Sequence, residues 1–295
     1  MKLKQVKGPE NLIPLTKKWL YTEVSIITRK LIRILAFIFL TVAALCGFFF
    51  VHELGKAKYE IADFADIRDG YTQTVSEPAD VNLSYPAGSK APSETSGLPF
   101  VLADFDALLR INPDTVGWIA IPGTVISYPV VQTTDNAKYL DISFEGKYSK
   151  AGTPFADMDN DMHALDANTI IYGHNMGSGR TDMFGSLTEY KDNDYFSSHR
   201  YIQFNTVYEQ HGWWRVFAVI EYDVRDDSFD PMQIRFADTV GFNKWIDKVK
   251  AVSLHDTDIE ILLSDRILTL STCDKSRYGR EGRLLVMAVK LNEYQ

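Results

Sequence analysis

Cysteine is scarce in this chain. Only Cys46 and Cys273 occur among its 295 residues. Cys46 lies within a long apolar run and Cys273 lies far outside it, so we expect no disulfide bond between them. Cys273 should therefore be a free thiol, which is either a small buried hydrophobic side chain or a reactive group.

Basic side chains are also in the minority. The chain has 31 Lys and Arg residues against 39 Asp and Glu, a net charge of −8. Residues 1–33 hold eight basic and two acidic side chains, so they carry +6 and leave −14 for residues 34–295. Neutralising phosphates requires a basic surface. The sequence therefore argues against nucleic-acid binding by the main part of the chain.

A recognisable metal-binding motif is missing from the sequence as well. Asp157, Asp159 and Asp161 lie close together, but the glycine and the distal glutamate of an EF-hand loop do not follow them. We interpret the three residues as solvated acids of a loop. We expect neither a metal nor any other cofactor.

Charged residues are absent from residues 34–51, and with its apolar flanks the segment 31–54 is long enough to cross a bilayer as a helix. A buried helix of a soluble domain would show a polar stripe every three or four residues, which this run lacks. A cleaved signal peptide would have a shorter apolar core and a small-x-small site, and we find no such site after Val51. We therefore expect an uncleaved membrane anchor.

The charges that flank this run predict its orientation. Basic residues precede it and acidic residues follow it, which places the N-terminus in the cytoplasm and the rest of the chain outside. We expect a single-pass protein of the cell membrane with an extracellular domain. Its parts would be a cytoplasmic basic tail (1–30), a transmembrane anchor (31–54), a helical stalk with a Ser/Pro-rich spacer (55–98) and a folded domain (99–295).

Short β-like runs separated by turn residues dominate the folded domain. Helical patterns are few, at 105–109, 182–190 and 240–252. This pattern of many short strands and few helices favours a closed barrel over a doubly wound sheet. The expected fold class is therefore mainly β with helices, that is, α+β. The expected strands are 116–121, 125–131, 169–172, 201–204, 213–222, 259–263, 267–272 and 284–291.

The run R-I-L-T-L-S-T-C at 266–273 reads as a strand that ends at Cys273. Alternation along a strand puts Leu268 and Leu270 on one face, the expected core face. Cys273 lies on the other face, just before the polar loop 274–282. This position favours a reactive thiol over a buried structural cysteine.

A nucleophilic thiol needs a histidine or arginine partner that favours the thiolate. Of six histidines, His174 stands out because it follows the apolar run 169–172 and Gly173 and opens a glycine-rich loop. A catalytic base at a barrel rim is commonly delivered by a strand in this way. The alternative for His174 is a capping or surface histidine. The remaining five lie in polar or loop-like settings.

Arg283 comes ten residues after Cys273 and opens the strand 284–289. If the intervening loop closes a hairpin, the guanidinium faces the thiol, where its planar fork of donors can hold an oxyanion. Arg277 and Arg280 lie within that loop and are expected to be solvated charges.

Several of these runs resemble the sortase family, and specifically class B. The resemblance covers residues 103–291, nearly the whole folded domain. It rests on T-L-S-T-C at 269–273, I-I-Y-G-H-N-M at 170–176, Arg283, I-N-P-D-T-V-G-W-I at 111–119, Y-P-V-V-Q at 128–132, D-N-A-K-Y-L at 135–140, M-F-G-S-L at 183–187 and the helical insert near 240–252.

The resemblance implies an eight-stranded sortase barrel with N-terminal helices and a helix in the loop before the catalytic strand, so that 99–295 would be the catalytic domain. Cys273 would cleave a C-terminal sorting motif of secreted proteins after Thr. It would pass the thioacyl group to an amine of a cell-wall peptide or peptidoglycan precursor. His174 would be the acid/base and Arg283 the oxyanion or substrate clamp. The peptide groove would comprise Asn136, Leu140, Tyr172, Ser271 and Asp274.

Three other functions remain as alternatives at this point. An L,D-transpeptidase usually has Gly directly before its cysteine, whereas this chain has Thr272. A papain-like cell-wall peptidase places its cysteine at a helix N-terminus, not at a strand end. The third alternative is a non-catalytic wall-binding barrel in which Cys273 is inert.

Overall fold

A computed structural model describes residues 15–75, 93–177 and 179–291. The chain divides into two compact units, Met1–Lys56 and Ala57–Gln295. Residues 1–14 of the predicted basic tail and residues 76–92 of the predicted spacer lie outside the described residues.

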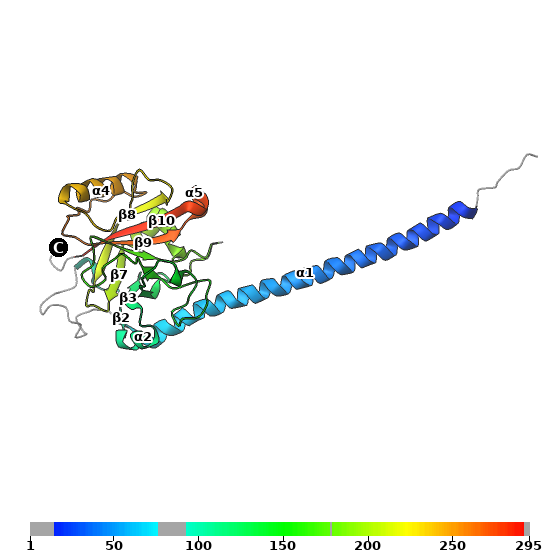
Figure 1. The fold of residues 1–295 in the computed structure, drawn as a ribbon, viewed down its shortest axis with the longest axis horizontal. Coiled ribbons are helices and arrows are strands. Elements are labelled where there is room, and N and C mark those ends of the chain that lie inside the picture. The colour runs from blue at the N-terminus through cyan, green and yellow to red at the C-terminus, as the bar shows by residue number, and fades with distance from the viewer. Residues whose placement is uncertain (1–14, 76–92, 178, 292–295) are drawn as a thin grey trace, which may run out of the picture. The chain divides into compact units, whose positions relative to one another are not determined.

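The long helix α1 (Leu15–Tyr71) makes up the described part of the first unit and continues into the second (Figure 1). Its segment Thr28–His52, 25 residues long, is long and apolar enough to cross a membrane. The side chains of this segment are exposed. Length and composition alone support this assignment, and a signal sequence would share both.

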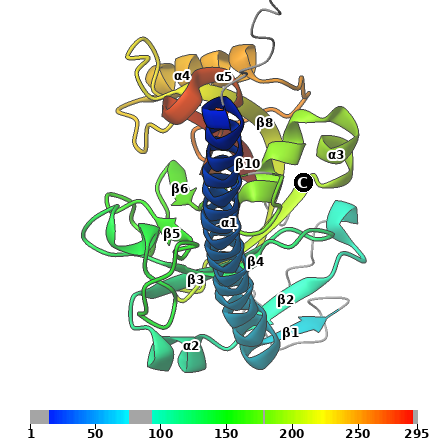
Figure 2. The ribbon, with the colours of Figure 1, turned by 90° about the vertical axis from the view of Figure 1, so that its right-hand side faces the viewer.

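The second unit is built on a closed barrel of eight strands. Their order around the barrel is β10-β8-β7-β3-β4-β5-β6-β9, and the pairs β4–β5 and β6–β9 are parallel. Figure 2 shows the strands from a second side. The expected fold class is therefore confirmed. The strands are β3 (Thr115–Ala120), β4 (Ser127–Val131), β5 (Phe155–Ala156), β6 (Asn168–Tyr172), β7 (Tyr201–Thr206), β8 (Trp213–Asp223), β9 (Ile267–Cys273) and β10 (Gly282–Lys290).

Helices and a short two-stranded sheet surround the barrel. The sheet pairs β1 (Thr72–Val75) with β2 (Phe100–Ala103). The α-helices are α2 (Phe105–Ile111), α3 (Asn193–Ser198), α4 (Thr239–Val252) and α5 (Lys275–Tyr278). The 3₁₀ helices are η2 (Ser93–Thr95), η3 (Lys138–Leu140), η4 (Gly185–Lys191) and η5 (Gly279–Glu281).

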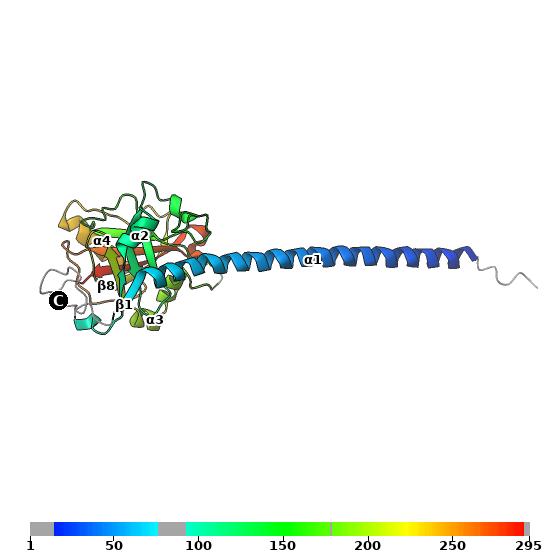
Figure 3. The same ribbon diagram turned by 90° about the horizontal axis from the view of Figure 1, so that it is seen from below.

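Two hydrophobic cores hold this unit together. The first fills the barrel and includes Trp118 and Leu270, both fully buried. It also takes in the end of α1, where Phe64 packs edge-on against Tyr128 with ring centroids 5.3 Å apart. The second core lies between α4 and the outer face of β8 and β10. Figure 3 shows α4 from below, beside β8. Burial on both faces leaves β9 and β10 rigidly held.

Two of the expected elements differ in the structure. Residues 259–263 were expected to form a strand, and this is wrong: the segment is irregular, and Ile259, Ile261 and Leu263 pack into the second core instead of joining a ladder. The eighth strand is β5, whose two residues are too few to produce a periodic signal. The helix expected at 182–190 is the 3₁₀ helix η4.

Candidate active site

Cys273 ends β9, and the pairing of β9 determines its neighbours. In the antiparallel ladder with β10, Cys273 lies directly opposite Arg283. Directly paired residues project from the same face of a sheet. Cys273 lies on the face opposite Leu268 and Leu270, as expected, but that face is buried at Thr269 and Ser271 and becomes partly exposed only at Cys273. The thiol is half-buried there, beside the guanidinium.

His174 reaches the same edge because β6 and β9 run parallel, with Tyr172 opposite Ser271. Three hydrogen bonds tie the segment after β6 to the end of β9. The Gly173 N–H donates to the Ser271 carbonyl (3.1 Å), and the Thr272 hydroxyl donates to the Gly173 carbonyl (2.8 Å). The third bond runs from the Asn175 side-chain amide to the Cys273 carbonyl (2.9 Å). The structure thus brings His174 to the strand end that bears the thiol.

Among the residues that the structure describes, the imidazole of His174 has one hydrogen-bond partner. Its Nε2 lies 2.6 Å from the backbone carbonyl oxygen of Leu140, in η3. Because a carbonyl oxygen accepts and cannot donate, this contact requires the proton to be on Nε2. Nδ1 then remains as the ring nitrogen that can take up a proton, which is the arrangement a general base needs.

The guanidinium of Arg283 is fixed by its own loop. Its Nη1 donates to the carbonyl oxygens of Gly282 (2.9 Å) and Arg280 (3.1 Å). These bonds leave Nη2 and Nε for a ligand, as far as the described residues show. Arg277 instead pairs with Glu221 at 3.1 Å.

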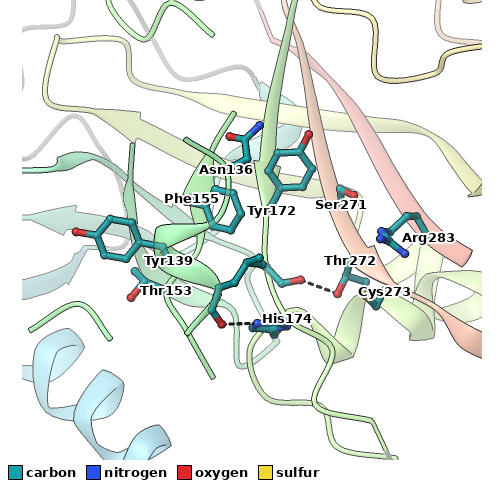
Figure 4. A pocket seen from close by; sticks show the side chains of 12 residues that line it. Asn136, Tyr139, Thr153, Phe155, Tyr172, His174, Ser271, Thr272, Cys273 and Arg283 are labelled. Carbon is teal, nitrogen blue, oxygen red and sulfur yellow. Dashed lines mark hydrogen bonds between the residues drawn. The ribbon is translucent and has the colours of Figure 1, made fainter. Parts of the chain in front are cut away.

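The side chains of Cys273, His174 and Arg283 line one cleft of about 250 Å³. Figure 4 draws Cys273 between His174 and Arg283 at one end of it. Of the predicted groove residues, Asn136, Leu140, Tyr172 and Ser271 line the cleft. The sequence analysis missed Tyr139, Thr153, Phe155 and Thr272, which line it too.

Asp274 is not brought into the cleft. Its side chain is buried behind the strand end, where it forms an ion pair with Lys191 and accepts from the Ser276 N–H at 3.0 Å. Burial alone would raise the pKa of this carboxyl, but the hydrogen bonds from Lys191 and Ser276 hold the pKa below its ordinary value. Lys191 also reaches Glu221 at 3.2 Å. This network braces the loop between β9 and β10.

The acidic segment after β5 differs from the expectation. Asp159 and Asp161 are exposed, as predicted, but Asp157 is only 7% exposed. Its carboxylate accepts hydrogen bonds from two side chains of the cleft wall, Tyr172 and Asn136. Nothing in the local sequence signals this, because both partners are distant in the chain. Among the described residues, no group of three or more acidic, His or Cys side chains is arranged to hold a metal ion.

Comparison with known proteins agrees with this geometry. Residues 119–291 match the family model described as the sortase domain. Sortase B of Listeria monocytogenes is 37% identical over 182 residues, which cover 61% of this chain and 70% of that protein.

Solved structures give the same result. A Staphylococcus aureus sortase B–substrate complex is 31% identical, with a TM-score of 0.58 over 64% of this chain and 84% of the other. A Bacillus anthracis protein described as similar to sortase B is 30% identical, with a TM-score of 0.61 over 78% of this chain and 96% of the other.

The family match covers more than half of the chain, and the relatives agree on class B. This excludes the L,D-transpeptidase, the papain-like peptidase and the non-catalytic barrel as alternatives. The chain belongs to the sortase family, in class B, and is a sortase cysteine transpeptidase.

Proposed function

We propose that Cys273, His174 and Arg283 carry out this transpeptidation. The observation that carries the proposal is the strand register, which sets Cys273 opposite Arg283. The hydrogen bonds of Gly173 and Asn175 to the end of β9 hold His174 at the same edge of the sheet. A thiol, a proton acceptor and a fork of oxyanion donors at one end of a cleft are the groups that acyl transfer requires.

The first half-reaction cleaves a peptide bond. His174 takes the thiol proton, and the Cys273 sulfur attacks the carbonyl carbon of the threonine in the sorting motif. The oxyanion that develops on the carbonyl oxygen is stabilised by the guanidinium of Arg283. His174 then gives its proton to the leaving amine nitrogen, the C–N bond breaks, and a thioester joins the threonine to Cys273.

The second half-reaction forms a new peptide bond. An amine of a cell-wall peptide or peptidoglycan precursor loses a proton to His174 and attacks the thioester carbonyl. The oxyanion is again stabilised by Arg283. The C–S bond then breaks, the sulfur regains a proton from His174, and the anchored protein leaves.

The cleft is proposed as the groove for the sorting motif of secreted proteins. Asn136, Leu140, Tyr172 and Ser271 line it and would contact the peptide. Asp274 lies outside it, so we assign Asp274 to bracing the loop that carries Arg283 and not to direct peptide contact.

We further propose that the apolar part of α1 anchors the protein in the cell membrane with the N-terminus in the cytoplasm and the barrel outside. The basic residues before the segment and the acidic residues after it support this orientation. Protease added to intact cells stripped of their wall should degrade the barrel. Protection of the barrel while the cells are sealed would contradict the orientation.

The full-length protein in detergent tests the catalytic proposal. It is incubated with a pentapeptide library that has threonine fixed at the fourth position, with triglycine as the amine. Mass spectrometry should detect a thioester on Cys273 and a product in which triglycine follows the threonine. The variant Cys273→Ala should give neither while it retains the wild-type thermal unfolding profile. Turnover by that variant would refute the cysteine mechanism.

A further inference from the structure

Asp157 is a buried acid that the proposed reaction does not use. It follows β5 directly, and its backbone is fixed on both sides. Its N–H donates to the Ile170 carbonyl (2.9 Å), and the side chain of Gln132 donates to its carbonyl (2.8 Å). The side chain is therefore placed by a rigid backbone, and its position does not depend on a mobile loop.

The carboxylate of Asp157 is held by neutral donors. Oδ2 accepts from the Tyr172 hydroxyl (2.8 Å) and from the Asn136 side-chain amide (2.9 Å). Oδ1 accepts from the Asp159 N–H (2.9 Å). Among the residues that the structure describes, no ion pair joins Asp157 to a Lys, Arg or His. A buried carboxylate in this position is an acceptor only, so every group that touches it must donate.

This requirement fixes the polarity of two side chains in the cleft wall. Tyr172 has a single hydroxyl hydrogen, and it is committed to Asp157. The hydroxyl can therefore offer only its lone pairs to a ligand. Asn136 accepts from the Met158 N–H through Oδ1 (2.8 Å) and gives one amide hydrogen to Asp157, so its second amide hydrogen is the one donor that it can still offer to a ligand.

We propose that Asp157 is a positioning residue that sets the hydrogen-bond polarity of the peptide groove. Through Asp157, the Tyr172 oxygen becomes an acceptor that selects a hydrogen-bond donor on the bound peptide. This inference rests on the proposed function, in which the cleft holds the sorting peptide.

The titration of Tyr172 is consistent with this arrangement. Burial, followed by the hydrogen bond to Asp157 and the negative charge of that carboxylate, raises the pKa of the phenol far above its ordinary value. The hydroxyl therefore keeps its proton across the physiological range and remains the donor toward Asp157.

The first test replaces the carboxylate by an amide of the same shape. In Asp157→Asn, one carboxylate oxygen becomes an NH₂ group. In one orientation of the amide this NH₂ faces the Asp159 N–H, and in the other it faces the donors of Tyr172 and Asn136. In either orientation a donor faces a donor. We expect the KM for the best-cleaved pentapeptide of the threonine library to rise about tenfold or more. The second half-reaction, followed with triglycine on the preformed thioester, should keep its rate because the groove is needed to capture the peptide.

The matched control is Asp159→Asn. It removes the same charge two residues along the same loop, but its side chain is exposed and does not touch the cleft wall. Its KM should equal that of the wild type. Equal KM values for Asp157→Asn and the wild type would overturn the proposal, and so would an equal rise in both variants, because bulk charge would then be the cause.

The second test removes donors from the peptide and remains decisive if Asp157→Asn fails to fold. Each backbone N–H of the best pentapeptide, except at the scissile bond, is replaced in turn by an ester oxygen, and each side-chain donor by a non-donor of similar shape. One replacement should raise the KM of the wild type about tenfold and leave that of Tyr172→Phe nearly unchanged. If each replacement raises the KM by the same factor in the wild type and in Tyr172→Phe, no donor of the peptide is coupled to the Tyr172 hydroxyl, and the proposal fails.

Failure of the proposed function would look different. In that case the wild-type protein would form no thioester with any library member, and no KM could be compared. If the wild type forms the Cys273 thioester and the variants behave alike, the function stands and only the role of Asp157 is refuted.

Discussion

The substitution Arg283→Lys separates the charge of this side chain from its geometry. In the structure, Nη1 uses its hydrogens on the carbonyl oxygens of Gly282 and Arg280, and these two bonds orient the planar group beside Cys273. Lysine keeps the positive charge but has a single nitrogen. If that nitrogen binds the loop carbonyls, it cannot also serve the oxyanion, and if it turns to the cleft, it loses the contacts that orient it.

The expected loss follows from this geometry. The variant lacks one pre-oriented donor at the oxyanion, and removal of such a donor costs roughly 3–4 kcal/mol of transition-state stabilisation, or a factor of about 10²–10³ in kcat. The KM for peptide should change little, because the donor acts on charge that develops only in the transition state. The substitution exchanges one cation for another, so the pH dependence of kcat should keep its shape.

The assay is steady-state cleavage of the best library peptide from pH 5 to 9, with thermal unfolding measured in parallel. Arg280→Lys and Arg277→Lys are the matched controls, because they change the same residue type in the same loop. Near wild-type turnover of Arg283→Lys would refute the oxyanion assignment. A large loss in one of the controls instead would move the role to that arginine.

Three further predictions test the surroundings of the site. His174→Ala should slow both half-reactions by about 10²–10⁴, because each requires a proton transfer, and pre-steady-state thioester formation and its aminolysis measure them separately. Gly173→Ala should lower the free energy of unfolding in urea by about 1–3 kcal/mol and abolish turnover, since the new methyl group would meet the fully buried ring of Phe184 at 2.5 Å; wild-type stability would contradict this packing. Lys191→Met should be less stable than the wild type at neutral pH, and because Asp274 has a pKa below its ordinary 3.8, the difference should shrink as the pH falls through that lowered pKa. A stability difference that stays constant down to pH 2 would show that the ion pair is not its source.

The sequence alone was enough for features that depend on local periodicity. The alternation in R-I-L-T-L-S-T-C predicted a strand with Leu268 and Leu270 inside and Cys273 at its end, and β9 has this form. The short loop before Arg283 predicted a hairpin, and the two strands pair with Arg283 opposite Cys273. Residues close in the chain determine both features, so a pattern within ten or twenty residues is sufficient to reveal them.

Tertiary structure decided the features that depend on distant residues. Residues 259–263 have the composition of a strand, yet Ile259, Ile261 and Leu263 pack into the second core, which includes α4, without pairing to another strand. The two residues of β5 become a strand only because β4 and β6 flank them.

The same reason explains the polar partners around the site. The carbonyl of Leu140 holds His174 from 34 positions away, and Asp157 receives Tyr172 and Asn136 from 15 and 21 positions away. An acid looks the same in the sequence whether it is solvated, like Asp159, or buried against the cleft wall, like Asp157. The difference is the set of donors that folding brings to it, and a hydrogen bond between distant segments leaves no periodic trace in the chain.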